Sequence, residues 1–414
     1  MLILITNDPR PYAWGSTSAI AALLGRPESG LPEAELWLGA HPGSPARILD
    51  PAAVGGYQDL AAWIKAEPEA ALGSRLASTG RLPFLLKILA AAAPLSLQAH
   101  PTPDQAAAGF ERENLAGIPV DAPNRNYRDP HHKPEILVAL SDRFEALCGF
   151  LPTADIQGIL HELRQLDATA PHPRPDLLDA FAGRLDAADP LPETVSWLLG
   201  GSEDVESLVA HVVRLAVRAS NRDQPGAVPA AAFETVRQLA RDYPADPGVI
   251  VGLLVHRVSL VRGQALFLPA GNIHAYLQGL GLEVMAASDN VLRGGLTSKH
   301  IDVPELLDVL DFSPIPVPFL IPEEPTPGVR VFRPAVPDFV LLEVTLKDTT
   351  VELPIHGPAV VLSTAGQAEL VGHRSSTALR RGEACYATPE EERLRLRGAG
   401  EFFIATPGVI ATTP

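Results

Sequence analysis

Two polar side chains that can bind a metal stand two residues apart in an otherwise apolar stretch. The segment Ser96-Leu97-Gln98-Ala99-His100-Pro101 places Gln98 and His100 on one face if it forms a strand. Glu135 and His274 add a carboxylate and a second imidazole from distant parts of the chain. Together they form a nitrogen and oxygen set that suits zinc or another borderline divalent metal. A single histidine in an apolar strand is more often a hydrogen-bonded core residue, so spacing alone leaves metal binding open.

Lysine is scarce in this chain, and three of the lysines lie near these candidate ligands. Of the 33 basic residues only five are lysines: Lys65, Lys87, Lys133, Lys299 and Lys347. An ammonium differs from a guanidinium in hydration, shape and readiness to lose a proton. We therefore treat Lys87, Lys133 and Lys299 as candidate functional groups, with chance as the alternative for so small a number.

Length and composition limit the class of protein. A length of 414 residues allows about two or three domains. A net charge of -16 argues against nucleic acid or an anionic membrane surface as the main partner, since both require a basic face. The longest apolar stretch, at 82–99, is interrupted by Lys87 and Pro94, and the first residues do not resemble a signal peptide. With only Cys148 and Cys385, a disulfide framework is excluded, and we expect a cytoplasmic protein.

The spacing of apolar residues divides the chain into regions. Residues 1–150 alternate short apolar segments with Pro, Gly and Asp, a pattern typical of antiparallel strands. From about 153 to 243 the spacing becomes helical, with Pro-rich breaks at 171–175 and 190–192. Strands are predicted again at Val249–Val255 and Ala265–Leu268. After a Pro-rich linker to about 328, further strands at regular intervals predict a sandwich or jelly roll.

Two segments also resemble each other within the chain. Arg262-Gly263-Gln264-Ala265-Leu266-Phe267-Leu268 is similar to Arg381-Gly382-Glu383-Ala384-Cys385-Tyr386-Ala387, with a glycine turn before a strand in both. Only the first copy leads on to a histidine, His274. Two related barrels are one explanation, of which only the first would carry metal chemistry, and the commonness of such turns is the other.

Longer motifs resemble the class I phosphomannose isomerases. The similarity extends to about residue 312 and is carried by Tyr12-Ala13-Trp14-Gly15, AELWLGAHP at 34–42, LPFLLKIL at 82–89, PLSLQAHP at 94–101, HKPEILVAL at 132–140 and HAYLQGLGLEVMAASDNVLRGGLTSKHID at 274–302. The resemblance implies a zinc-dependent interconversion of mannose 6-phosphate and fructose 6-phosphate, feeding mannose and GDP-mannose metabolism. It also implies one zinc ion per chain, with Gln98, His100, Glu135 and His274 as ligands. His131 stands where the family often has Asn, and it adds an imidazole nearby.

The resemblance also implies a fold that agrees with the regions above. We expect a mainly β protein with two cupin-type jelly-roll barrels and a small helical domain. The expected domains are a catalytic jelly roll at 1–150 and 245–313, a helical insertion at 151–244, and a C-terminal jelly roll without a metal at 325–414. We expect a monomer whose partner is a small sugar phosphate.

An aldose–ketose isomerase needs a base and an electrophile, because the carbon acid is weak unless the enediolate oxygen is stabilised. Arg293 is the candidate cation beside the enediolate or the phosphate, with a salt bridge to Asp289 or Glu283 as the alternative. The base is Glu283 or Lys133, and the sequence does not choose between them. Lys87, Lys299 and Ser96 are candidate phosphate ligands. Trp14 and Tyr276 are candidates to stack on the sugar, whereas Trp37 is expected to pack in the core.

Two other functions fit parts of the pattern. A cupin oxygenase would use a histidine-rich site with iron, and both Gln98 and the candidate phosphate-binding cations speak against it. A sugar-phosphate sensor would keep the pocket without turnover, although no gap in the ligand set favours it. Metal analysis with an isomerase assay separates the three.

Overall fold

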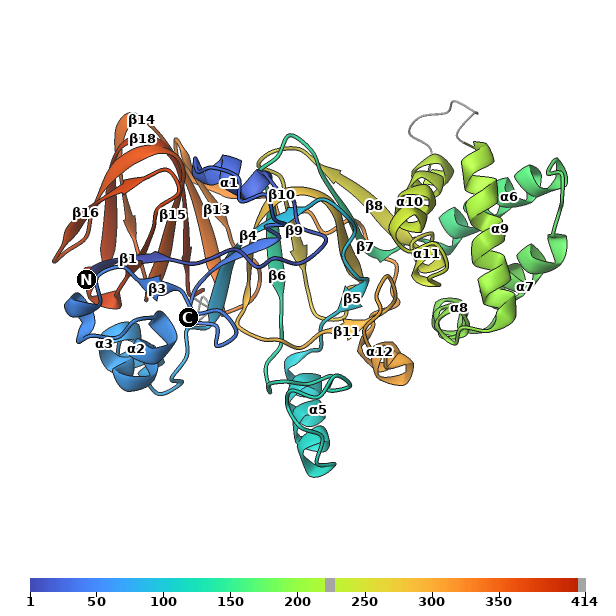
Figure 1. Cartoon of the computed structure of the whole chain (residues 1–414), viewed down its shortest axis with the longest axis horizontal. Helices are drawn as coiled ribbons and strands as arrows, with labels where there is room; N and C mark the ends of the chain where they lie inside the picture. Colours follow the sequence, from blue (N-terminus) through green and yellow to red (C-terminus); the bar gives the residue numbers. More distant parts are fainter. Residues whose placement is uncertain (220–227, 409–414) are drawn as a thin grey trace.

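Two nine-stranded sheets, here called the central sheet and the C-terminal sheet, organise a computed structural model that describes residues 1–219 and 228–408 (Figure 1). The central sheet contains β2 (Glu35–Leu38), β4 (Phe84–Ala91), β5 (Gln98–Ala99), β6 (Glu135–Ala139), β7 (Phe144–Phe150), β8 (Val255–Leu260), β9 (Ala265–Leu268), β10 (His274–Ala286) and β11 (Leu292–Arg293). The C-terminal sheet contains β1 (Leu2–Thr6), β3 (Arg47–Ile48), β12 (Glu323–Thr326), β13 (Val329–Phe332), β14 (Val340–Pro354), β15 (Ala359–Val371), β16 (Ser376–Arg380), β17 (Ala384–Ala387) and β18 (Arg393–Thr406). The expected mainly β architecture is therefore confirmed.

Helices cover both sheets and form a separate group on the far side of the central sheet (Figure 1). The separate group is α6 (Thr153–Ala168), α7 (Pro175–Leu185), α8 (Pro190–Leu199), α9 (Glu203–Ala219), α10 (Val228–Asp242) and α11 (Gly248–Val251). The others are α1 (Ala19–Leu24), α2 (Leu60–Ala66), α3 (Pro68–Leu72), α4 (Ser74–Ala77), α5 (Pro103–Leu115) and α12 (Val303–Val309), with 3₁₀ turns at Pro51–Val54 and Pro389–Glu391. In the described part of the chain, no helix is both long and apolar enough to cross a membrane.

The helical spacing predicted for 153–243 matches helices in the structure. Ile156, Ile159, Leu160 and Leu163 are buried on one face of α6. The first predicted break, 171–175, ends at Pro175, the first residue of α7, whereas the second, 190–192, forms the first turn of α8, which begins at Pro190. Proline fits the first position of a helix because its missing N–H has no helical partner there. The strand predicted at Val249–Val255 is wrong: these residues form α11 and a turn before β8, because they pack into the apolar core of the helical group.

Strand β10 is the centre of the central sheet and brings the predicted site residues together. It pairs with β4 and β6 along its second half and with β5 and β7 along its first half. The antiparallel pairing of β10 with β5 places His274, the first residue of β10, opposite Gln98, the first residue of β5. The next strand, β11, places Arg293 opposite Gln98 on its other side.

The first strand of the chain lies in an unexpected sheet. The sequence assigned residues 1–150 to the first domain, but β1 pairs with β17, and β3 pairs with β1, so both extend the C-terminal sheet. The physical reason is packing. Ile3, Ile5 and Ile48 belong to an apolar core to which both sheets contribute, through β4 of the central sheet and β15 and β18 of the C-terminal sheet. Alternating apolar residues show which face of a short strand is buried, but they do not determine which strand it pairs with.

The internal repeat predicted from the sequence has a structural counterpart in its turns. Gly263 precedes β9 with a φ of 82°, and Gly382 precedes β17 with a φ of 84°. Glycine is favoured at both positions because other residues rarely adopt this left-handed conformation. The chain from β9 continues to His274, and the chain from β17 continues to Thr388 in the C-terminal sheet.

Candidate metal centre and substrate cavity

Three candidate ligands from three parts of the chain converge in the central sheet. The Nε2 atom of His100 lies 3.4 Å from Oε1 of Glu135, and Nε2 of His274 lies 3.5 Å from Oε2 of the same carboxylate. Each of these side chains is about 1% exposed. A tetrahedral zinc with ligands at about 2.1 Å would separate neighbouring ligand atoms by about 3.4 Å. The spacing of the two imidazoles and the carboxylate therefore fits such an ion.

Hydrogen bonds at Nδ1 orient both imidazoles with Nε2 toward Glu135. Nδ1 of His100 donates to the carbonyl oxygen of Asn290 at 2.8 Å, and Nδ1 of His274 donates to that of Asn272 at 3.0 Å. Each Nε2 atom consequently carries the lone pair that binds a metal. Nε2 of His100 and both oxygens of Glu135 are buried without a hydrogen-bond partner among the described residues. A divalent cation would satisfy these groups.

Gln98 lies beside this group as the expected fourth ligand. Its Nε2 atom is 3.3 Å from Nε2 of His274. Turning the side-chain amide by half a rotation exchanges its nitrogen for its oxygen, which places an oxygen ligand on the same side. The position fits the four-ligand set that the family resemblance implies.

Asn290 holds the surroundings of His100 in place. It is fully buried, and its side-chain amide donates to the carbonyl oxygens of Asp129 at 2.7 Å and of His131 at 2.8 Å. Its Oδ1 atom accepts the backbone N–H of Arg128 at 2.7 Å. These contacts make Asn290 a supporting residue that fixes the backbone to which the His100 ring donates.

Charges around Glu135 favour the ligand form of each group. The Nζ atom of Lys133 lies 3.1 Å from Oε1 of Glu135. Burial alone would raise the pKa of Glu135, but the Lys133 ammonium, together with His100 and His274, outweighs it and keeps this pKa well below its ordinary value. Burial, aided by Lys133, lowers the pKa of His100 to about 4. Near neutral pH the carboxylate is therefore ionised and the His100 ring is neutral.

A cavity of about 360 Å³ opens beside these ligands. Five predicted side chains besides Gln98 and Lys133 reach it, namely Trp14, Lys87, Ser96, Arg293 and Lys299. The side chains that form its inner wall are contributed by neighbouring strands, since Trp37 on β2 lies opposite Lys87 on β4, and Lys87 lies opposite Glu283 on β10. Most of the predicted substrate-binding residues therefore share one cavity.

Lys87, which is part of this wall, forms a buried ion pair with Glu283, which does not line the cavity. Nζ of Lys87 lies 3.0 Å from Oε2 of Glu283 and 3.6 Å from Oε1 of Glu35. Burial raises the pKa of Glu283, while the ammonium of Lys87 opposes that shift. Two carboxylates already neutralise Lys87, which makes it a poor match for the predicted phosphate contact. Glu35 was not singled out in the sequence, where a carboxylate two residues before Trp37 gives no distinct signal.

A bulge in β10 decides which way Glu283 points. The pairing of β10 with β7 shifts by one residue between Tyr276 and Gln278. Because side chains alternate along a strand, seven residues would place Tyr276 and Glu283 on opposite faces. The extra residue at the bulge restores them to the same face. Glu283 therefore lies close enough to Tyr276 to help raise the pKa of its buried phenol, after burial itself.

One aromatic prediction needs correction, and a second holds with an addition. Tyr276 is 2% exposed, does not line the cavity, and packs edge-on against Phe144 at 5.5 Å, so it lies beneath the site and cannot stack on a sugar. Trp37 is buried with Leu85 and Met285 in a small apolar cluster, as expected, and one part of it also lines the cavity. Its indole N–H donates to Glu35 at 2.9 Å, and the Lys87 ammonium lies 5.2 Å from its ring. These bonds fix its ring as part of the cavity wall.

Three cations of the cavity lining have no carboxylate partner among the described residues. Arg293, Lys299 and Arg128 all line it, and in the described part of the chain none of the three side chains forms an ion pair. Asp289 pairs with His41 and Glu283 with Lys87, so neither forms the salt bridge considered for Arg293. Burial lowers the pKa of Lys299, and the charges of Arg293 and Arg128 add to the effect. Arg128 was missed because arginine is common in this chain.

Comparisons with known proteins identify the family. Residues 2–153 match the family model described as phosphomannose isomerase type I, catalytic domain. The mannose-6-phosphate isomerase of Salmonella typhimurium is 36% identical over 402 residues, which cover 96% of this chain and 97% of that protein. The chain belongs to the type I phosphomannose isomerase family. The human mannose-6-phosphate isomerase is 33% identical over 382 residues, covering 86% of this chain and 85% of its own.

Solved structures of phosphomannose isomerases have the same fold. A mannose 6-phosphate isomerase from Salmonella typhimurium bound to fructose 6-phosphate and zinc superimposes with a TM-score of 0.85 at 34% identity, covering 99% of this chain and all of that chain (100%). A zinc-bound form of mannose 6-phosphate isomerase gives the same values. The similarity was expected to weaken beyond residue 312, but these alignments extend through the C-terminal sheet.

Proposed function

We propose that this chain is a zinc-dependent isomerase that interconverts mannose 6-phosphate and fructose 6-phosphate. The observation that carries the proposal is the buried group of His100, Glu135 and His274, which lies beside Gln98 and a cavity lined by cations without carboxylate partners in the described chain. Membership of the family supplies the reaction, and relatives bound to zinc and to fructose 6-phosphate supply the cofactor and substrate class.

Zinc held by Gln98, His100, Glu135 and His274 would supply a Lewis acid near the sugar oxygens. Arg293 would stabilise the negative charge that develops on the enediolate oxygen, because it lies opposite Gln98 in the sheet and has no carboxylate partner in the described chain. Arg128, Lys299 and the Ser96 hydroxyl would hold the phosphate at the open end of the same cavity. Trp14 would lie against the sugar.

Lys133 is our candidate for the base. It lines the cavity, whereas Glu283 lies behind the wall in an ion pair with Lys87. A base must come within hydrogen-bond reach of the proton it removes. Glu283 would then position Lys87 and Tyr276.

We also propose the finer architecture and setting of this enzyme. The central and C-terminal sheets would be cupin-type jelly rolls, with a catalytic unit formed by 1–150 and 245–313, a helical insertion at 151–244 and a C-terminal unit at 325–414. Strands β1 and β3 would tie the first segment to the last. We expect a cytoplasmic monomer that recognises a sugar phosphate.

Metal analysis combined with a coupled isomerase assay tests the proposal. We expect one zinc per chain, loss of turnover on chelation, and recovery on adding zinc. His100→Ala should lose the metal. His131→Asn is the matched control and should keep it, because only the backbone oxygen of His131 accepts the bond from Asn290. Full activity without metal, bound iron with oxygenase activity, or bound zinc without turnover would each contradict the proposal.

A further inference from the structure

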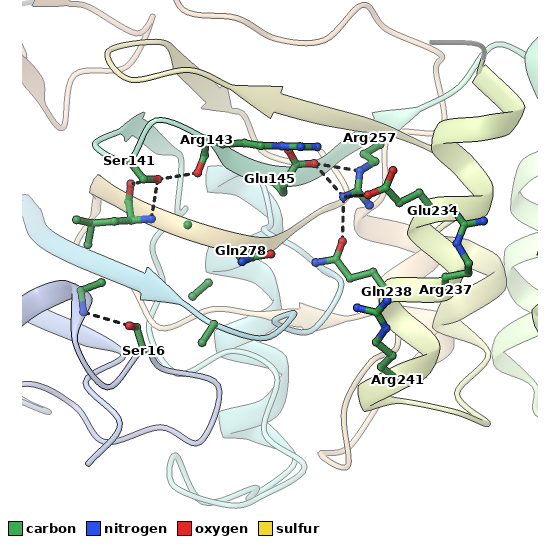
Figure 2. Close-up of a pocket in the computed structure, with 15 residues that line it drawn as sticks. Ser16, Ser141, Arg143, Glu145, Glu234, Arg237, Gln238, Arg241, Arg257 and Gln278 are labelled. Atoms are coloured by element: carbon green, nitrogen blue, oxygen red, sulfur yellow. Dashed lines mark hydrogen bonds and ion pairs between the residues drawn. The ribbon is translucent and has the colours of Figure 1, made fainter. Parts of the chain in front are cut away.

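A second cavity, of about 760 Å³, lies outside the metal site between α10 and strands β4, β7, β8 and β10 (Figure 2). We call it the arginine cavity, because Arg143, Arg237, Arg241 and Arg257 line it. Its volume falls in the range of about 300–1,000 Å³ that is usual for small-molecule sites. Nothing in the proposed isomerase reaction uses it.

The charge of this cavity runs against that of the whole chain. Four guanidinium groups face two carboxylates, Glu145 and Glu234, in a protein with a net charge of -16. Arg257 lies 3.0 Å from Glu145 and 3.7 Å from Glu234, and Arg143 pairs with Glu145. The two carboxylates are therefore engaged on the side of the cavity formed by Arg143 and Arg257, as Figure 2 shows.

The remaining two arginines, on α10, lack anionic partners in the described chain. The Arg237 side chain donates one hydrogen bond, to the carbonyl oxygen of Ala216 at 2.8 Å, and the Arg241 side chain forms no hydrogen bond or ion pair with a described residue. They are four residues apart, so they are neighbours on one face of the helix, where like charges destabilise it. An anion bound between them would relieve this repulsion. Guanidinium groups bind phosphate oxygens in pairs, which makes phosphate the best-matched anion.

Neutral polar groups complete the lining. Gln278 on β10 and Gln238 on α10 face the cavity in Figure 2, with the hydroxyls of Ser16 and Ser141 farther along its wall. Such groups donate and accept hydrogen bonds and match a ligand with several hydroxyls. In the described lining there is no aromatic ring on which a nucleotide base would stack.

The arginine cavity adjoins the substrate cavity without being part of it. Ala92 faces the arginine cavity, and Ser96, four residues later, faces the substrate cavity. At the end of α10, Arg241 likewise lines the arginine cavity and Tyr243 lines the substrate cavity. The Tyr243 hydroxyl donates to the carbonyl oxygen of Pro94 at 3.2 Å, which closes the partition between the two spaces.

We propose that the arginine cavity binds a phosphorylated polyhydroxy compound, with Arg237 and Arg241 on the phosphate and Gln238 and Gln278 on the hydroxyls. The full-length zinc protein is titrated with glucitol 6-phosphate in a calorimeter, with inorganic phosphate as the second probe. We expect two sites per chain for glucitol 6-phosphate. Inorganic phosphate should bind the arginine cavity more weakly because it lacks the hydroxyls, and equal affinity of the two probes there would overturn the assignment of the hydroxyl contacts.

Variants on each side of the partition assign the two sites. Arg237→Gln with Arg241→Gln should weaken one site by at least about tenfold and leave the other unchanged. The double variant Arg128→Gln with Lys299→Gln should weaken only the site in the substrate cavity. If it does not, the proposed phosphate site of the isomerase is wrong, and the proposal for the arginine cavity is unaffected. Arg164→Gln, which removes an exposed arginine paired with Asp179 on another helix, is the matched control.

Gln278→Glu provides a test that does not depend on the double variant folding. It adds a negative charge at an exposed position facing the cavity and should weaken the same site. A single site in the parent protein, or two unchanged sites in both Gln278→Glu and the folded double variant, would overturn the proposal.

Discussion

At the scale of single residues, Arg293 is expected to act in the transition state. It lies opposite Gln98 in the sheet, and no described carboxylate neutralises it. Arg293→Ala should lower kcat about 100-fold or more with a modest change in KM, because the lost interaction forms chiefly at the barrier. Steady-state kinetics checks this, with Lys299→Ala as the comparison that should mainly raise KM. A raised KM with unchanged kcat in Arg293→Ala would instead assign Arg293 to ground-state binding of the phosphate.

Lys133 presents a separate question about the proton. The Lys133 ammonium lies 3.1 Å from Glu135. Arginine at this position would keep a positive charge beside Glu135 but would not act as a base near neutral pH. Lys133→Arg should therefore retain zinc and lose exchange of solvent protons into the substrate, along with at least about 100-fold in kcat. Metal content and isotope exchange by NMR are the measurements. A fully active, zinc-loaded variant would remove Lys133 from the candidates and leave Glu283 as the base.

At the scale of elements, strand β10 has a glycine directly after its bulge, at a position where a side chain does not fit. Gly279 has a φ of 129°, and a Cβ atom there would lie 2.7 Å from the ring of Phe144. Gly279→Ala should lower the free energy of unfolding by about 1–3 kcal/mol or more. Gly158→Ala is the control, because Gly158 lies in α6 with open space around it, and alanine should stabilise the helix by up to about 1 kcal/mol. Urea unfolding of both variants tests whether their effects have opposite signs.

Strands β7 and β8 are joined by an ion pair that predicts a pH dependence. Burial would raise the pKa of Glu145, but Arg143, Ser259 and Arg257 outweigh it and lower that pKa. The folded protein then binds this proton less readily than the unfolded chain, so the stabilisation is complete above the unfolded pKa of about 4.3 and is lost as pH falls through the folded value. Urea titrations from pH 7 to pH 3 should show a smaller loss of stability for Glu145→Gln than for the parent. Identical acid limbs would contradict this role.

At the scale of the whole molecule, the C-terminal sheet is expected to contribute stability and no catalytic group. Phe403 on β18 lies in the apolar core shared by the two sheets. Phe403→Ala should lower the free energy of unfolding by about 3–5 kcal/mol while the folded fraction keeps its kcat. Glu383→Gln is the control at a polar site of the same sheet and should leave turnover within a few-fold. A collapse of kcat in folded Glu383→Gln protein would give this sheet a catalytic role.

The sequence by itself identified the groups that could bind a metal and the broad class of fold. Residue type alone restricts which side chains bind a metal, and the motifs around His100, Glu135 and His274 identify the family. Helical spacing predicted α6 because its apolar residues all meet one core. Each of these features depends on residues that are close together in the chain, so the sequence alone is enough to predict it.

Only the tertiary structure decided how distant segments meet. Strand β1 joins the C-terminal sheet because its partner is chosen by a shared core. A one-residue bulge turns Glu283 toward Tyr276, and pairing across β2, β4 and β10 neutralises Lys87 with two carboxylates. Arg128 and Arg241 resemble every other arginine in the sequence, and they become distinctive only because the described chain brings no carboxylate to them. Whether a charge is paired depends on contacts between residues far apart in sequence, so residue order alone does not reveal it.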